Sequence, residues 1–146
     1  MTKELRDTLP KFPYIYQSLF VVLFLSFFNN YAFAQCTNTS AYGTATAPIN
    51  NLPLQISTCN YQTEYNTISS IIAGNTYLIN NSSGGYITIR RDASNGTVVA
   101  HGTAPLSFTA PTSGTYYVHY NTNSLCGTAS NCATTTITCT SCPAPI

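Results

Sequence analysis

The chain has 146 residues, of which only 6% are charged, and its formal net charge is +1. This composition excludes the clustered basic surface of a nucleic-acid-binding protein. A net charge near zero also gives no reason to expect an acidic partner. The chain contains 11 tyrosines and no tryptophan, and it is rich in Thr, Ser and Asn. Such residues suit strands that face solvent on one side.

The N-terminal segment has the organisation of a secretory signal peptide. Three basic side chains occur among residues 1–13, and a continuous apolar block follows at 19–28. Ala32-Phe33-Ala34 then fits the small-x-small pattern of a cleavage site. We therefore predict a signal-peptide helix within residues 1–34, with cleavage after Ala34. The alternatives are an uncleaved membrane anchor, for which the apolar block is short, and a lipid on Cys36.

All six cysteines follow the predicted cleavage site, at Cys36, Cys59, Cys126, Cys132, Cys139 and Cys142. An even number of cysteines in a secreted domain of about 110 residues indicates disulfides. The short loop between Cys126 and Cys132 makes a local bridge the best single choice. Cys59 then has two candidate partners, Cys36 and Cys139. The Cys139-x-x-Cys142 spacing also occurs in redox and zinc sites, but these need a helix start or a second Cys/His pair.

The rest of the chain alternates short strand patterns with turns. Strands are predicted at 41–47, 54–59, 63–72, 76–80, 86–91, 97–101, 106–109, 115–121 and 133–139. No stretch after residue 34 has helical periodicity. Seven to nine short strands at this spacing predict an all-β fold, an antiparallel β-sandwich of jelly-roll type. The predicted module covers 35–140, and the Pro-rich segment 141–146 is expected to be a linker to a downstream module.

The clearest strand signal lies at 105–120, where two alternating apolar runs flank a turn at 110–114. It predicts a β-hairpin or a strand-turn-strand unit. Alternation by two residues places one set of side chains in the core. This set consists of Leu106, Phe108, Tyr116, Val118 and Tyr120.

Several short motifs together resemble a known module. They are A-G-N-T-Y-L-I (73–79), G-Y-I-T-I (85–89), the 104–120 run and Cys126-Gly127 followed by Cys132-x-Thr-Thr-Thr. Over residues 36–145 the chain resembles an N-terminal β-sandwich module of secreted and surface proteins of Bacteroidetes. The pattern is also similar to bacterial pre-peptidase C-terminal domains and, at 85–92, to CUB domains. The resemblance implies Sec-dependent export, commonly type IX secretion, and a role in adhesion or beside surface enzymes.

Little in the sequence indicates catalysis. The only acidic side chains after residue 34 are Glu64 and Asp92, which lie on different predicted elements, so paired-carboxylate chemistry is not expected. His119 lies mid-strand and has no acid nearby in the sequence to orient it. Two acids would also leave a calcium ion few ligands. We therefore expect no enzyme activity, no cofactor and no metal site.

Outward-facing side chains are the better candidates for a function. Alternation places Tyr86, Arg90, Tyr117 and His119 on the outer side of their strands, where they would form an exposed ligand surface. The alternative is that the aromatic residues are there only because they favour strands.

The predicted function is a non-catalytic module, secreted or at the cell surface, for adhesion or for carbohydrate or protein binding. Its partners would be a glycan or a surface protein and the downstream modules of its own chain. We expect no nucleic acid partner, and no membrane contact after signal cleavage. The alternatives are a structural spacer and an accessory domain of a secreted hydrolase.

Overall fold

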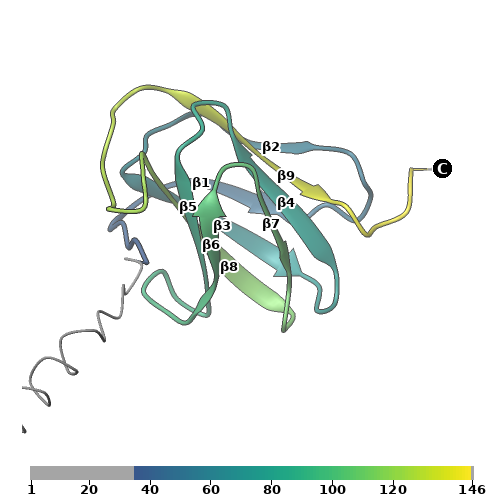
Figure 1. Ribbon diagram of the computed structural model, residues 1–146. Helices are drawn as coiled ribbons and strands as arrows, with labels where there is room; N and C mark the ends of the chain where they lie inside the picture. The colour runs from purple at the N-terminus through teal and green to yellow at the C-terminus, as the bar shows by residue number, and fades with distance from the viewer. Residues whose placement is uncertain (1–34, 146) are drawn as a thin grey trace, which may run out of the picture. The chain divides into compact units, whose positions relative to one another are not determined.

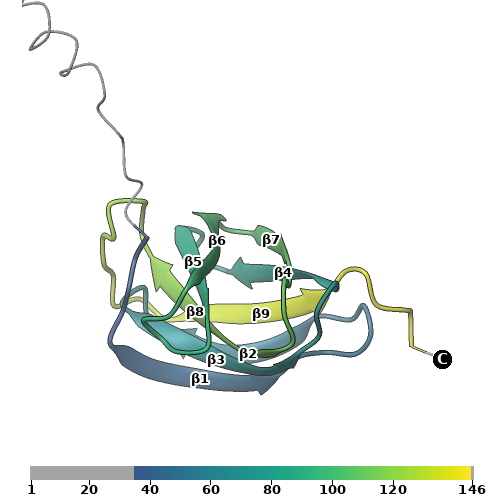
Figure 2. The same cartoon turned by 90° about the horizontal axis from the view of Figure 1, so that it is seen from below.

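The computed structural model describes residues 35–145, which form a β-sandwich of a five-stranded and a four-stranded sheet. Sheet A has the order β1 (Ser40–Thr46), β3 (Glu64–Ile71), β8 (Gly114–Asn121), β5 (Tyr86–Arg91) and β6 (Val98–Thr103). Sheet B has the order β2 (Leu54–Asn60), β9 (Ala133–Cys139), β4 (Thr76–Asn81) and β7 (Leu106–Thr109). Figures 1 and 2 show the two layers from two directions.

The predicted all-β sandwich is confirmed, with nine strands in the described part of the chain. β1 runs parallel to β3, and all the other pairs are antiparallel. Within residues 35–145 no helix is long and apolar enough to cross a membrane. The predicted signal peptide lies outside the described residues.

The core fills the space between the two sheets. Sheet A contributes the inward side of β3, β5 and β8, and sheet B contributes that of β4, β7 and β9. The largest apolar side chains that are fully buried are Ile68, Ile71, Tyr77, Ile79, Ile87, Ile89, Tyr116, Val118, Tyr120 and Ile137. The core is therefore built from side chains that alternate along the strands, as the period of two requires.

Buried tyrosine hydroxyls have hydrogen-bond partners. The hydroxyl of Tyr116 donates to the carbonyl of Thr112 at 2.7 Å, four residues upstream. The hydroxyl of Tyr77 accepts from the backbone N–H of Ile72 at 3.1 Å. Because each hydroxyl keeps a partner, the rings can be buried without the cost of an unpaired polar atom.

The 105–120 segment is a strand-turn-strand unit and not a hairpin. β7 belongs to sheet B and β8 belongs to sheet A, so the chain crosses from one layer to the other between them. The predicted core face of the segment is confirmed, with Phe108 6% exposed, Tyr116, Val118 and Tyr120 fully buried, and Leu106 packed against the core. The hairpin alternative is wrong because β7 pairs with β4, whereas β8 pairs with β3 and β5.

All six cysteines form disulfides, which join Cys36 to Cys126, Cys59 to Cys132 and Cys139 to Cys142. The predicted bridge between Cys126 and Cys132 is therefore wrong. The second bond lies beside the last pair of β2 and β9, in which Asn60 is opposite Ala133.

The first residues of the predicted linker are attached to the sandwich. The backbone N–H of Thr76 donates to the hydroxyl of Ser141 at 2.9 Å. The carbonyl of Pro143 accepts from the N–H of Asn51 at 3.1 Å. Ser141 is therefore attached to the start of β4, and Pro143 to the loop between β1 and β2.

Candidate functional site

The predicted ligand surface lies on the outer face of sheet A, where the strand register brings its residues together. Arg90 of β5 is opposite Tyr117 of β8, and Thr88 is opposite His119. The predicted exposure is wrong for three of the four side chains. His119 is 0% exposed, Tyr86 is 7% exposed and Arg90 is 9% exposed, whereas Tyr117 is half-buried. Whether these four residues bind a ligand stays a prediction.

The N-terminal strap, which we define as residues 35–39, lies against two of these buried side chains, His119 and Arg90. The backbone N–H of Asn38 donates to Nδ1 of His119 at 2.9 Å. The backbone N–H of Cys36 donates to the hydroxyl of Thr88 at 3.2 Å. The disulfide from Cys36 to Cys126 fastens the strap to the loop after β8. Residues 35–39, which precede the first predicted strand, thus cover part of the outer face of the sheet.

Arg90 is held between the strap and the turn that follows β5. Its Nη2 donates to the hydroxyl of Thr37 at 2.6 Å and to the carbonyl of Gln35 at 3.1 Å. Its Nη1 donates to the carbonyl of Gly96 at 2.8 Å. All of these acceptors are neutral oxygens, so the guanidinium is buried without a carboxylate partner from residues 35–145. Burial lowers the pKa of Arg90 below its usual value.

His119 is neutral in this environment. Burial, followed by the positive charge of Arg90, lowers the pKa of its imidazole to about 4, and the backbone of Ser94 opposes this shift only in part. Nδ1 accepts a hydrogen bond, so the ring proton is on Nε2. Nε2 itself is buried without a hydrogen-bond partner in the described part of the chain.

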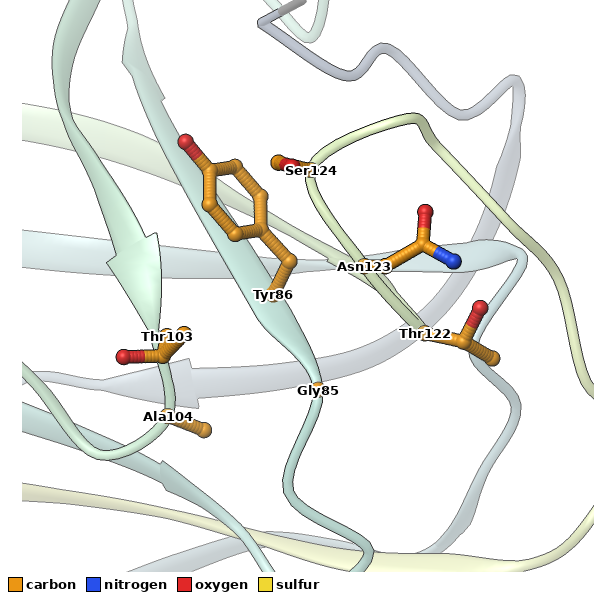
Figure 3. A pocket seen from close by; sticks show the side chains of 7 residues that line it. All are labelled: Gly85, Tyr86, Thr103, Ala104, Thr122, Asn123 and Ser124. Atoms are coloured by element: carbon orange, nitrogen blue, oxygen red, sulfur yellow. The ribbon is translucent and has the colours of Figure 1, made fainter. Parts of the chain in front are cut away.

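Tyr86 contributes to a shallow hollow, which we call the Tyr86 hollow. Its volume is about 510 Å³, and it is lined by Gly85, Tyr86, Thr103, Ala104, Thr122, Asn123 and Ser124. Figure 3 shows Tyr86 between Thr103 and Ala104 on one side and the 122–124 loop on the other. The hydroxyl of Tyr86 lies 2.6 Å from Nδ1 of His101, which fixes the ring. The lining has hydroxyls, an amide and one aromatic ring, and no charge.

A second surface lies between β1 and β2, and the sequence analysis missed it. We call residues 46–54 the apolar loop. Three aliphatic side chains project from it, with Ile49 76% exposed, Leu52 53% exposed and Leu54 38% exposed. The loop surrounds a hollow of about 480 Å³. The signal was present in the run P-I-N-N-L-P-L at 48–54, which carries no charge.

The apolar loop is held in place by hydrogen bonds. The side-chain oxygen of Asn50 accepts from the N–H of Leu52 at 3.0 Å. The N–H of Asn51 donates to Pro143, and the N–H of Ala47 donates to Ser69 at 2.9 Å. The exposed aliphatic side chains are therefore presented by an ordered backbone.

The two acidic side chains within residues 35–145 lie in different parts of the fold, Glu64 at the start of β3 and Asp92 in the turn after β5. The carboxylate of Glu64 accepts from the N–H of Tyr61 at 2.8 Å, within a turn. Asp92 is exposed and lies 3.6 Å from Arg91. Among residues 35–145, no group of three or more His, Cys, Asp or Glu side chains is placed to hold a metal ion.

Comparison with known proteins finds no matching family model and no matching curated protein. The solved structures that are similar to this chain include two inhibitors of g-type lysozyme. One is Aeromonas hydrophila PliG, a periplasmic inhibitor of g-type lysozyme, with 10% identity and a TM-score of 0.43. The other is a mutant of the corresponding Escherichia coli inhibitor, with 12% identity and a TM-score of 0.35. Each match covers 68% of this chain and 98% of the inhibitor.

These comparisons correct the resemblance drawn from the sequence. The resemblance to Bacteroidetes surface modules, pre-peptidase C-terminal domains and CUB domains is wrong, since no family model matches this chain. The motifs that suggested it mark strands and turns, such as β5 and the turn at 110–114. Many β-sandwiches share such features without sharing an ancestor.

Proposed function

We propose that this chain is a non-catalytic binding module of a secreted or cell-surface protein and that it binds a protein partner through the apolar loop. The observation that carries the proposal is the exposure of Ile49, Leu52 and Leu54 within six residues. Exposed apolar side chains that cluster on a soluble domain mark sites of protein interaction. The signal-peptide pattern and the three disulfides support a location outside the cytoplasm.

The chemistry of the apolar loop favours a protein over other ligands. Residues 46–54 contain no charge, so they offer nothing to a phosphate or to an acidic lipid surface. Pro48 and Pro53 restrict the backbone, and the hydrogen bonds to Ser69 and Pro143 restrict it further. An ordered apolar surface loses little conformational entropy on binding. The expected partner therefore presents a complementary apolar surface with polar groups at its rim.

The test compares the purified protein with a double variant, Ile49→Ser with Leu52→Ser, on an array of extracytoplasmic proteins that includes a g-type lysozyme. Leu125→Ser is the matched control, because Leu125 is 85% exposed but lies outside the apolar loop. We expect the double variant to bind its protein ligand at least about tenfold more weakly, because two buried aliphatic side chains are lost from the interface. Binding by Leu125→Ser should be unchanged.

Two outcomes would contradict the proposal. A protein ligand that binds the wild type and the double variant equally would place the interface elsewhere. The absence of any protein ligand would favour the structural spacer. An accessory role beside a hydrolase would instead appear as a dependence of that enzyme's activity on this module.

A second candidate function, carbohydrate binding, is favoured by the Tyr86 hollow. Neutral sugars are bound by hydroxyl and amide groups, and the hollow presents such groups without charge, whereas Tyr86 is 7% exposed and adds little ring surface. The ring of Tyr86 is fixed by His101, so the aromatic group is preorganised.

The test for this second function is a glycan array with the variant Thr103→Ala/Ser124→Ala. This variant removes two hydroxyls from the Tyr86 hollow and leaves Tyr86 in place. Thr97→Ala, an exposed threonine outside the hollow, is the control. Binding that is lost in the double variant and kept in the control would support this function. A glycan that both variants bind equally would exclude the hollow as its site.

A further inference from the structure

We propose that the N-terminal strap is an acid-sensitive clasp, in which protonation of His119 detaches Asn38 and its neighbours from the outer face of sheet A. This inference is independent of the ligand that the module binds. It rests on the contacts between the strap and two buried basic side chains, His119 and Arg90.

The first step is a conflict of donors at Nδ1 of His119. In the structure this atom accepts a 2.9 Å hydrogen bond from the backbone N–H of Asn38. Protonation places a hydrogen on Nδ1 and turns it into a donor. Two donors then face each other, so this contact between strap and sheet is replaced by repulsion.

The second step is that no residue among 35–145 supplies a compensating negative charge. The charged group that acts on His119 is Arg90, and its positive charge lowers the pKa of the imidazole. On β3, the ring of Tyr65 packs 5.2 Å from the imidazole, and Glu64 is engaged with Tyr61. In the turn after β5, Asp92 is exposed and lies next to Arg91. The strap itself has no charged side chain.

The other titratable groups on this face do not offset a charge on His119. On β6, His101 contacts the hydroxyl of Tyr86. On β8, Tyr117 packs edge-on against Tyr65. A buried imidazolium beside a guanidinium is therefore uncompensated, and solvent is the better environment for both.

Detachment does not free the strap completely. The disulfide between Cys36 and Cys126 keeps one point of it tethered at the end of the sheet. The strap can therefore leave and return without diffusing away. Its departure uncovers Thr88, Arg90 and His119, and so exposes the surface that was predicted from the alternation of the strands.

The experiment measures amide hydrogen exchange at Asn38 in the purified protein between pH 7 and pH 3, corrected for the intrinsic exchange rate. Protection should fall about tenfold for each pH unit between about pH 6.5 and 4, because the detached state binds one proton more. His119→Gln offers a carbonyl oxygen as acceptor and does not titrate, so its protection should not depend on pH in this range. His101→Gln, which alters the only other histidine, should behave like the wild type.

Two results would overturn the clasp. One is protection of Asn38 that stays constant in the wild type from pH 7 to pH 3. The other is an equal loss of protection in wild type and His119→Gln. If His119→Gln does not fold, the nuclear magnetic resonance titration of His119 in the wild type decides the question. A midpoint near the ordinary value of 6.5, with no change at the Asn38 amide, would reject the proposal.

Discussion

The side-chain amide of Asn66 on β3 donates a 2.9 Å hydrogen bond to the hydroxyl of Thr135 on β9, and this bond joins the two sheets inside the sandwich. The same amide nitrogen lies 3.3 Å from the hydroxyl of Tyr120. The side-chain oxygen of Asn66 accepts from the N–H of Gly43 at 2.8 Å. Burial raises the pKa of Tyr120, so this hydroxyl keeps its proton. A polar group thus sits in an apolar core with its partners in place.

The first prediction concerns the hydrogen bond between Asn66 and Thr135. Thr135→Val keeps the shape of the side chain but removes the hydroxyl, so Asn66 loses its nearer acceptor. We expect the free energy of unfolding to fall by about 1–3 kcal/mol, the cost of a buried polar group left short of a partner. Urea unfolding checks this, with Thr136→Val on the half-exposed side of β9 as the control. Equal stability of the two variants would contradict the prediction.

The second prediction concerns two adjacent glycines between β4 and β5. Gly84 and Gly85 have φ of +68° and +90°, a region that costs other residues about 1–2 kcal/mol. A side chain at Gly84 would meet open space, whereas one at Gly85 would collide with Gln62 and the carbonyl of Asn121. Gly85→Ala should therefore destabilise the fold more than Gly84→Ala in thermal unfolding. The reverse order would show that the backbone moves freely at Gly85.

The strands could be predicted from the sequence because alternation by two residues is a local signal. The alternation at 63–72 is only partial, with Tyr65, Ile68 and Ile72 as its apolar residues, and this has a structural cause. The pairing of β3 with β8 shifts register between Ile68 and Ile71, and Ser70 there has φ of +59°. This irregularity places Ile68 and Ile71, three residues apart, on the same buried side. Strict alternation therefore fails where the strand bulges.

The candidate site could not be predicted in the same way because it depends on contacts between distant segments. Alternation correctly placed His119 on the outer side of β8, but it gave no information about what covers that side. Asn38 lies 81 residues before His119 in the chain. The pairing of Cys36 with Cys126, across 90 residues, is non-local in the same sense. Burial of an outward side chain is thus a property of the whole fold.

The third prediction concerns stability and pH. The pKa of His119 is lowered from 6.5 to about 4 in the folded protein. Between these values the unfolded chain binds a proton that the folded chain does not, so the free energy of unfolding falls as the pH falls. Above about pH 6.5 the titration of His119 therefore does not lower the free energy of unfolding. By pH 4 the free energy of unfolding is lower by up to about 3 kcal/mol. Urea unfolding at several pH values should show this loss in the wild type and not in His119→Gln. An equal loss in both would assign it to other groups.

The fourth prediction separates the disulfides by the length of chain that they close. In the chain-entropy account a crosslink stabilises by restricting the unfolded state, and more so for longer loops. The bond from Cys36 to Cys126 spans 90 residues, whereas the bond from Cys139 to Cys142 spans 3. Replacing the first pair by alanine should cost about 4–5 kcal/mol, and replacing the second about 2 kcal/mol. Urea unfolding of the two double variants measures the difference. A larger cost for the short bond would mean that it stabilises chiefly by holding the end of β9 against the apolar loop.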